Sequence, residues 1–317
     1  MVKSSICKFN AVAIRLRASE ILHGFDRFLL SIPQWEVESG QVVALLGPSG
    51  SGKSTFLNIL GARMVPDEGK VWYVGKLHKR IPLVPGHPRI RMVRQDFGQM
   101  PYKSVRDNLL EFSGIRSEAA EHRLVKQWMK RMNLAPALTD KAKALSGGEL
   151  QRLAIAQAMV GQPGALLLDE PFSHLDPMSK LMIQDMLRAW QPRSNSTVVM
   201  VVHDVRDAMA WADRIDVMID GSIVESGIPE DIYARPQSEA MAYAFGRVNA
   251  SPVASAPDAM RNNPKSFVIN GQCYVRPEHV TDGMIPKGAK LLRVESEGSQ
   301  CLNVWEDASG HAWYDMA

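Results

Sequence analysis

The chain has 317 residues, of which 45% are hydrophobic and 22% charged, and its formal net charge is +3. This is the composition of an ordinary soluble globular protein, long enough for one large core or two domains, and it excludes a disordered or fibrous chain. The small net charge gives no reason to expect nucleic acid as a partner. Because no apolar run approaches the roughly 20 residues that cross a bilayer, we expect a cytosolic chain that reaches any membrane through separate partners.

Buried strands alternating with helices organise the first two thirds of the chain. Short apolar runs without alternation, typical of strands buried on both faces of a parallel sheet, occupy 42–46, 165–169 and 198–204. Apolar residues at helical spacing separate these runs, in 53–64, 148–160 and 180–190. This order predicts an α/β fold with a mostly parallel core sheet. Short strands are predicted in 69–94 and a helical insertion in about 96–145, where apolar residues recur at helical spacing.

The composition changes after Phe245. Residues 249–264 are rich in Ala, Ser, Pro and Asn, which predicts a linker. Residues 265–317 contain short β-like runs and predict a small β-rich domain, which at about 50 residues is marginal on its own. We therefore predict a main domain over 1–248, followed by the linker and a C-terminal extension. The three cysteines, Cys7, Cys273 and Cys301, lie too far apart for a metal-binding or disulfide framework.

A phosphate-binding loop follows the first predicted buried strand. The stretch "GPSGSGKST" fits the G-x-x-x-x-G-K-[ST] pattern between a strand and a helix, which is the context that this motif requires. Its glycines let backbone N–H groups converge on phosphate oxygens, and the helix adds its positive dipole end. Lys53 is expected to reach the β- and γ-phosphates, and the Ser54 hydroxyl to hold Mg²⁺. The loop comprises Gly47, Pro48, Ser49, Gly50, Ser51, Gly52, Lys53, Ser54 and Thr55.

Polar residues at the ends of the other buried strands complete a candidate catalytic set. Asp169 ends one strand, where a carboxylate can act on the metal, and Glu170 follows as the candidate base for an attacking water. His203 ends the third strand, on the carboxyl edge where α/β proteins bind ligands. Gln95 is a further candidate, since a side-chain amide there could sense the metal and its water.

A second glycine pair lies at "LSGGE", before another helical pattern. Ser146 and Glu149 have the S-x-x-E spacing of a capping box, which predicts that a helix begins here. Gly147 and Gly148 leave the helix end sterically bare, and a bare helix N-terminus attracts anions without a lysine. The pattern predicts a second phosphate cradle.

Together these motifs resemble the nucleotide-binding subunits of ATP-binding cassette (ABC) transporters. The order is the P-loop, Gln95, "LSGGE", "LLLDEP", "SHLD" and "VVHD", and the resemblance covers roughly 25–246. It implies a P-loop NTPase cassette with a mostly parallel core sheet, an antiparallel β subdomain and a helical insertion. The family's cofactors would be ATP and Mg²⁺.

The resemblance also implies roles for individual residues. Ser54, Gln95 and Asp169 would serve the metal, Glu170 would activate water, and His203 would hold the γ-phosphate. Ser146, Gly147, Gly148 and Glu149 would face the γ-phosphate bound by a second copy, and Asp176 would communicate across that dimer. An aromatic upstream of the P-loop would stack on adenine, for which Phe25 is the best candidate and Phe28 competes.

The C-terminal region resembles that of import-type members. "GIPEDIYARP" and "AYAFG" are similar to the end of the cassette in importers, and "YVRPEHV" to the signature of a small TOBE-like β-barrel regulatory domain. The expected partners are a second, identical subunit, transmembrane permease subunits and, for an importer, a substrate-binding protein. The expected location is the cytoplasmic face of the inner membrane.

Two alternatives stay open from the sequence. The chain could drive an exporter or a lipoprotein-release system, although the C-terminal extension favours import. It could also be a non-transport ABC ATPase acting on DNA or ribosomes, but it has one cassette and none of the long coiled-coil or zinc-bearing insertions of such relatives.

Overall fold

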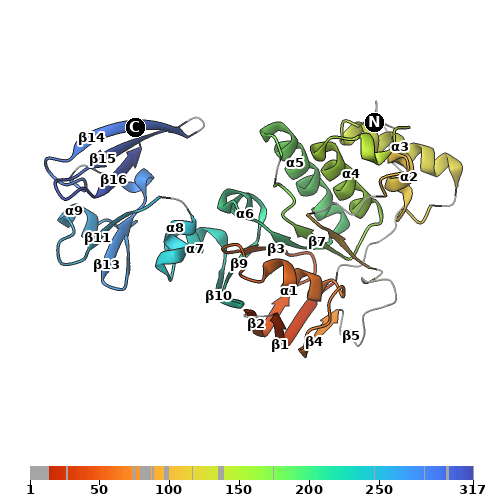
Figure 1. Ribbon diagram of the computed structural model, residues 1–317, viewed down its shortest axis with the longest axis horizontal. Helices are drawn as coiled ribbons and strands as arrows, with labels where there is room; N and C mark the ends of the chain where they lie inside the picture. The colour runs from red at the N-terminus through yellow and green to blue at the C-terminus, as the bar shows by residue number, and fades with distance from the viewer. Residues whose placement is uncertain are drawn as a thin grey trace. The chain divides into compact units, whose positions relative to one another are not determined.

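The computed structural model describes residues 14–25, 28–73, 76–78, 87, 89–95, 100–115, 117–134, 139–173, 175–245, 247–281, 283–297 and 300–316. The chain forms two compact units, Met1–Ser226 and Gly227–Ala317 (Figure 1). In the part of the chain that the structure describes, no helix combines the length and the apolarity that crossing a bilayer requires.

The first unit is built on a six-stranded sheet with the order β10-β9-β3-β8-β7-β6. Neighbouring strands from β9 to β6 are parallel, as the sequence predicts. Every residue of the three central strands is buried, which explains their continuous apolar runs. The strands are β3 (Val42–Leu46), β6 (Ile90–Val93), β7 (Ala165–Asp169), β8 (Thr197–Val201), β9 (Arg214–Ile219) and β10 (Ser222–Gly227).

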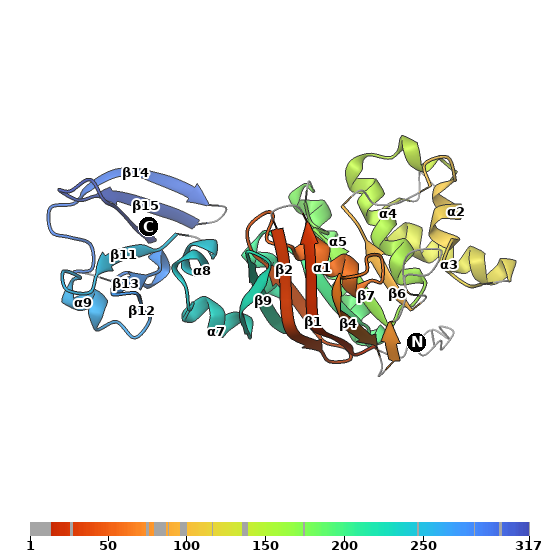
Figure 2. The same cartoon turned by 60° about the horizontal axis from the view of Figure 1, so that its bottom comes forward.

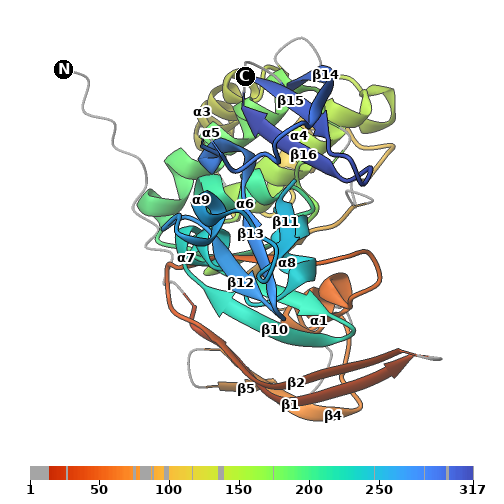
Figure 3. The same cartoon turned by 90° about the vertical axis from the view of Figure 1, so that its left-hand side faces the viewer.

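A second, antiparallel sheet packs against this core. Its order is β2-β1-β4-β5, from β1 (Leu16–Phe25), β2 (Phe28–Val37), β4 (Glu68–Tyr73) and β5 (Lys76–His78). Apolar residues of β1 and β2 share one buried cluster with Phe56 and Leu57 of helix α1 (Lys53–Leu60) and with the core strands. Figure 3 shows the strands of this sheet lying together next to α1. The P-loop helix is thereby fixed on both sides.

Helices complete the first unit. The main ones are α4 (Gly147–Val160), α5 (Pro177–Ser194) and α6 (Val205–Trp211). The predicted insertion contains α2 (Val105–Leu110), α3 (Glu118–Arg131) and the short 3-10 helix η2 (Ala142–Ala144); 96–99, 116 and 135–138 lie outside the described residues. Figure 2 shows α2 beside α4 and α3, on which it packs. The predicted fold class is confirmed in this unit.

The second unit contains two small antiparallel sheets and short helices. The sheets have the orders β11-β13-β12 and β14-β15-β16. The strands are β11 (Asn249–Pro252), β12 (Phe267–Ile269), β13 (Gln272–Val275), β14 (Lys290–Glu297), β15 (Gln300–Glu306) and β16 (Ala312–Met316). The helices are α7 (Pro229–Ala234), α8 (Glu239–Ala244), α9 (Asp258–Arg261) and the 3-10 helix η3 (Pro277–His279).

The stretch 249–264, predicted as a linker, is folded. Its first residues form β11, which pairs with β13, and its later residues include α9. Ala256 and Met260 are buried in a core with Trp313, and the Asn249 side chain exchanges two hydrogen bonds of 2.7 Å with the backbone of Tyr314. Strand pairing and a few buried apolar residues hold a segment whose composition alone indicates a flexible connection.

Candidate functional site

Two glycines give the P-loop its shape. Gly47 and Gly52 have φ of 149° and 95°, backbone angles that residues with a side chain rarely adopt. A Cβ on Gly47 would lie 2.0 Å from the Met218 carbonyl oxygen, and a Cβ on Gly52 would lie 2.7 Å from the Phe28 ring. Glycine is therefore required at both ends of the turn between β3 and α1.

The Lys53 side chain lies inside the loop that it terminates. Its Nζ donates hydrogen bonds to the carbonyl oxygens of Gly47 at 2.8 Å and Pro48 at 2.7 Å, and to Ser51 Oγ at 3.2 Å. Burial lowers the pKa of Lys53, and the negative charges of Glu170 and Asp169 oppose that change. The loop thus holds a desolvated cation at the positive end of α1.

Ser54 and Asp169 form the part of the site that fits a divalent cation. The Ser54 hydroxyl donates to Asp169 Oδ1 at 2.8 Å. Burial raises the pKa of Asp169, although the Ser54 hydrogen bond lowers it. A hydroxyl oxygen beside a desolvated carboxylate is the donor chemistry that Mg²⁺ prefers, so these residues fit the predicted metal.

The Glu170 carboxylate is held from two sides. One oxygen, Oε1, lies 2.6 Å from His203 Nε2, and the other, Oε2, accepts a hydrogen bond of 3.3 Å from Gln95 Nε2. The backbone at Glu170 has φ of 51°, and the Ser173 hydroxyl donates to its carbonyl oxygen at 2.8 Å. A side chain fixed in this way can accept a proton at a defined position.

One cleft joins these groups. It has a volume of about 330 Å³ and is lined by Phe28, Ser49, Gly50, Gly52, Lys53, Ser54, Thr55, Glu170 and His203. The structure therefore brings together the P-loop, the candidate base and His203, which come from the carboxyl ends of β3, β7 and β8. Phe28 is the aromatic residue of the cleft; the Phe25 side chain lies outside the described residues.

Comparison with known proteins identifies this arrangement. The sequence profile described as ABC transporter matches residues 30–173. The matched region is an ABC transporter ATPase domain. The cassette MJ0796, solved as a dimer in a post-hydrolysis state with ADP and Pi, superposes with a TM-score of 0.60 and 25% identity over 68% of this chain and 98% of that one.

Curated relatives of this ATPase domain carry transport names. The glycine betaine/carnitine transport ATP-binding protein GbuA of Listeria monocytogenes is 34% identical over 71% of this chain and 58% of its own length. The Fe(3+) ions import ATP-binding protein FbpC of Agrobacterium fabrum is 37% identical over 68% and 61%. The molybdate/tungstate import ATP-binding protein WtpC of Pyrococcus horikoshii is 29% identical over 90% and 86%. The chain thus spans about three fifths of the first two relatives.

The second glycine pair of the ABC ATPase domain begins α4. Ser146 Oγ accepts from the Glu149 amide at 3.4 Å, and Glu149 Oε2 accepts from the Ser146 amide at 2.9 Å, so the predicted capping box is present. Asp176 likewise caps α5 by accepting from the amides of Met178 and Ser179. Among the described residues, neither segment lines the cleft. Their contact with nucleotide stays a prediction that requires a second copy.

One residue that supports the site was not predicted from the sequence. Gln151, on α4, donates through Nε2 to the Pro171 carbonyl oxygen at 2.6 Å and is 2% exposed. This hydrogen bond joins α4 to the turn after Glu170. Nothing in its local sequence distinguishes it from other polar residues of an amphipathic helix, so only the fold reveals it.

Proposed function

We propose that this chain binds and hydrolyses ATP as the motor subunit of a membrane ABC transporter that works as an importer. The observation that carries the proposal is the Glu170 carboxylate, held between Gln95 and His203 in the same cleft as Lys53. The P-loop amides and the N-terminus of α1 suit the phosphates of ATP, and the Phe28 ring at the cleft supplies an apolar surface.

The chemistry follows from the positions of these side chains. Glu170 takes a proton from water as the water oxygen attacks the γ-phosphorus, and the bond to the bridging oxygen breaks to leave ADP and phosphate. Lys53 offsets the negative charge of the β- and γ-phosphates, and His203 holds the water or the γ-phosphate beside Glu170. Mg²⁺, held by Ser54 and Asp169 with Gln95 nearby, would neutralise phosphate charge.

The proposed partner chains follow from surfaces that suit contacts with other proteins. The first turn of α4 and the Asp176 cap suit a second, identical copy that shares its nucleotide, which the dimeric MJ0796 structures support. Apolar side chains shortly after Gln95 suit a permease subunit, since Met100 and Tyr102 are 42% and 73% exposed. A subunit with these partners would work at the cytoplasmic face of the membrane.

Two observations favour import over the alternatives. The matched relatives FbpC and WtpC are import proteins by name, and a substrate-binding protein would belong to such a system. The second unit adds two small β-sheets after the cassette, which fits a short TOBE-like regulatory domain. Export, lipoprotein release and action on DNA or ribosomes have no comparable support.

Replacing Glu170 by Gln tests the ATPase. Loss of the proton acceptor should reduce ATP turnover at least about 100-fold, while ATP binding is retained because the P-loop is intact. Purified wild-type and Glu170→Gln proteins are compared for Mg²⁺-dependent phosphate release and for binding of a fluorescent ATP analogue. Glu118→Gln, at the exposed start of α3, is the matched control. ATP turnover by Glu170→Gln at the wild-type rate would contradict the proposal.

A further inference from the structure

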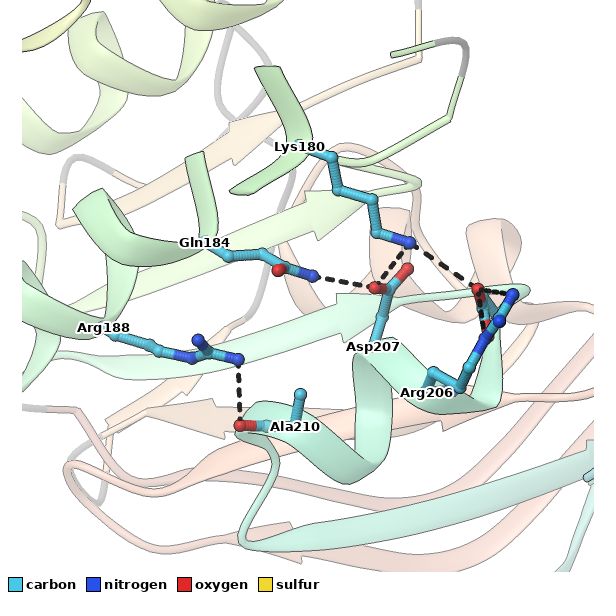
Figure 4. Close-up of polar contacts among 7 residues, drawn as sticks. Lys180, Gln184, Arg188, Arg206, Asp207 and Ala210 are labelled. Carbon is cyan, nitrogen blue, oxygen red and sulfur yellow. Dashed lines mark hydrogen bonds and ion pairs between the residues drawn. The ribbon is translucent and has the colours of Figure 1, made fainter. Parts of the chain in front are cut away.

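A buried carboxylate joins the two helices that follow the catalytic loops. Asp207, on α6, is 5% exposed. Its Oδ1 lies 2.8 Å from Lys180 Nζ and accepts a hydrogen bond of 2.8 Å from Gln184 Nε2, both on α5 (Figure 4). The contact is therefore a bridge between α5 and α6, in which Asp207 is buried and Lys180 is partly exposed.

The bridge extends to the residue next to His203. Lys180 Nζ also lies 3.6 Å from Asp204 Oδ2. Asp204 is the N-cap of α6 and accepts from the Arg206 amide at 2.9 Å. One ammonium group thus contacts both the N-cap acid of α6, Asp204, and the acid of its first turn, Asp207, and Asp204 directly follows His203 in the chain.

The bridge also lies one helical turn after the start of α5. Asp176 caps that helix, and the Lys180 amide donates to the Asp176 carbonyl oxygen at 3.0 Å. Lys180 therefore connects the segment that ends at Asp176 with the segment that carries His203. Its own ammonium group does not line the cleft, so it acts through other residues.

The energetics make this connection sensitive to Lys180. Burial raises the pKa of Asp207, and the hydrogen bond and charge of Lys180 oppose that rise. Removing Lys180 leaves a buried carboxylate with the Gln184 amide and a nearby like charge at Asp204. An unpaired buried charge is costly, so the first turn of α6 must move or Asp207 must take up a proton.

We infer that Lys180 is a positioning residue for ATP hydrolysis, which holds His203 against Glu170 by joining the first turns of α5 and α6. The inference rests on the proposed ATPase and deepens it. His203 Nε2 is 2.6 Å from Glu170 Oε1, so a small displacement of α6 changes the pair that handles the attacking water.

The test replaces Lys180 by Met, which keeps the length of the side chain and removes its charge. Misplacement of His203 should lower kcat about tenfold or more, with the KM for ATP within about twofold because the P-loop is unchanged. Asp207→Asn, which removes the buried charge and so avoids the folding penalty, should give the same loss of kcat. Lys180→Arg should restore most of the activity.

Two further variants separate positioning from simple destabilisation. In a His203→Ala background, Lys180→Met should lower kcat little further, because its effect passes through His203. Arg188→Met is the matched control: Arg188 Nη2 also joins α5 to α6, through the Ala210 carbonyl oxygen at 3.2 Å, but near the far end of α6 (Figure 4). It should leave kcat unchanged.

The outcomes distinguish the two proposals. A wild-type protein without ATPase activity would contradict the proposed function itself. An active wild type with unchanged kcat in folded Lys180→Met and Asp207→Asn would overturn only the positioning role. Equal losses in Arg188→Met, or a full additional loss in the His203→Ala background, would overturn it as well.

Discussion

The helices α1 and α4 both begin next to glycines, yet their first turns differ. At α1 the N-cap is Gly52, which makes no side-chain cap, and no acidic residue lies in the first turn. At α4 the N-cap Ser146 and Glu149 bond reciprocally, so that the helix caps itself with its own carboxylate. The first N-terminus is free to bind an anion, whereas the second is already partly satisfied.

The charge near the two helix N-termini also differs, since it is positive at α1 and negative at α4. Lys53 lies at the start of α1, inside the cleft. At α4 the side chain in the first turn is the Glu149 carboxylate, which hydrogen bonds from Ser146 keep ionised by lowering its pKa. This difference indicates that α1 can bind phosphate alone, whereas for α4 we expect a nucleotide whose charge is offset elsewhere. We therefore expect α4 to act in turnover rather than in the first binding of ATP.

The largest expected effect is at the α1 site. Lys53→Met removes the cation and should weaken ATP binding about 10- to 100-fold, because hydrogen bonds to charged groups contribute about 1.5–3 kcal/mol. Titration with a fluorescent ATP analogue measures the change. Lys130→Met, at an exposed position of α3, is the control and should bind normally. Equal affinity in Lys53→Met would remove the distinction between the two helices.

The next effect is at α4 and should leave binding intact. Ser146→Arg places a bulky cation at the helix end, and we expect turnover to fall at least about 100-fold, as for loss of a preorganised transition-state contact. ATP binding by the monomer should stay unchanged, since this residue does not line the cleft. Ser117→Arg, at the uncapped start of α3, is the control. Normal hydrolysis by Ser146→Arg would show that α4 takes no part in turnover.

Local sequence was sufficient for much of the site. The P-loop is one continuous segment, and the capping box needs only Ser146 and Glu149. Asp169 and His203 were predicted to lie close together because parallel strands end at the same edge of a sheet. These predictions depend on local motifs and on the general geometry of parallel sheets. The distances of the Ser54–Asp169 and His203–Glu170 pairs agree with them.

Contacts between distant segments were not predictable in this way, although Gln95 and Phe28 were candidates from the sequence. Gln95 contacts Glu170 from a position two residues after β6, a four-residue edge strand with only two buried residues, which gives a weak pattern. Gln151 and Phe28 reach the site through packing between helices and sheets. The stretch 249–264 has little apolar content, and its order comes from pairing with β13.

Asp169, which contacts Ser54 of α1, should affect thermal stability in the opposite direction from Glu149 of α4. Burial raises the pKa of Asp169, so the folded protein binds its proton more tightly than the unfolded chain. That contribution is present at low pH and is lost as pH rises through the folded pKa. Asp169→Asn, which can still accept from Ser54, should therefore raise Tm at neutral pH by about 2–4 °C, and the gain should shrink as pH falls. A gain independent of pH would contradict this origin.

Glu149 at α4 should show the opposite sign and the smallest effect. Hydrogen bonds from Ser146 lower the pKa of Glu149, so ionised Glu149 stabilises the fold above its unfolded pKa, and this contribution is lost as pH falls through the folded pKa. Glu149→Gln keeps a partner for the Ser146 amide and removes only the charge, so Tm at neutral pH should fall slightly, and the difference should close in acid. Thermal melts of wild type, Glu149→Gln and Asp169→Asn over one pH series measure both signs together. If both substitutions shifted Tm in the same direction, the opposite effects of burial at Asp169 and of the capping hydrogen bonds at Glu149 would be contradicted.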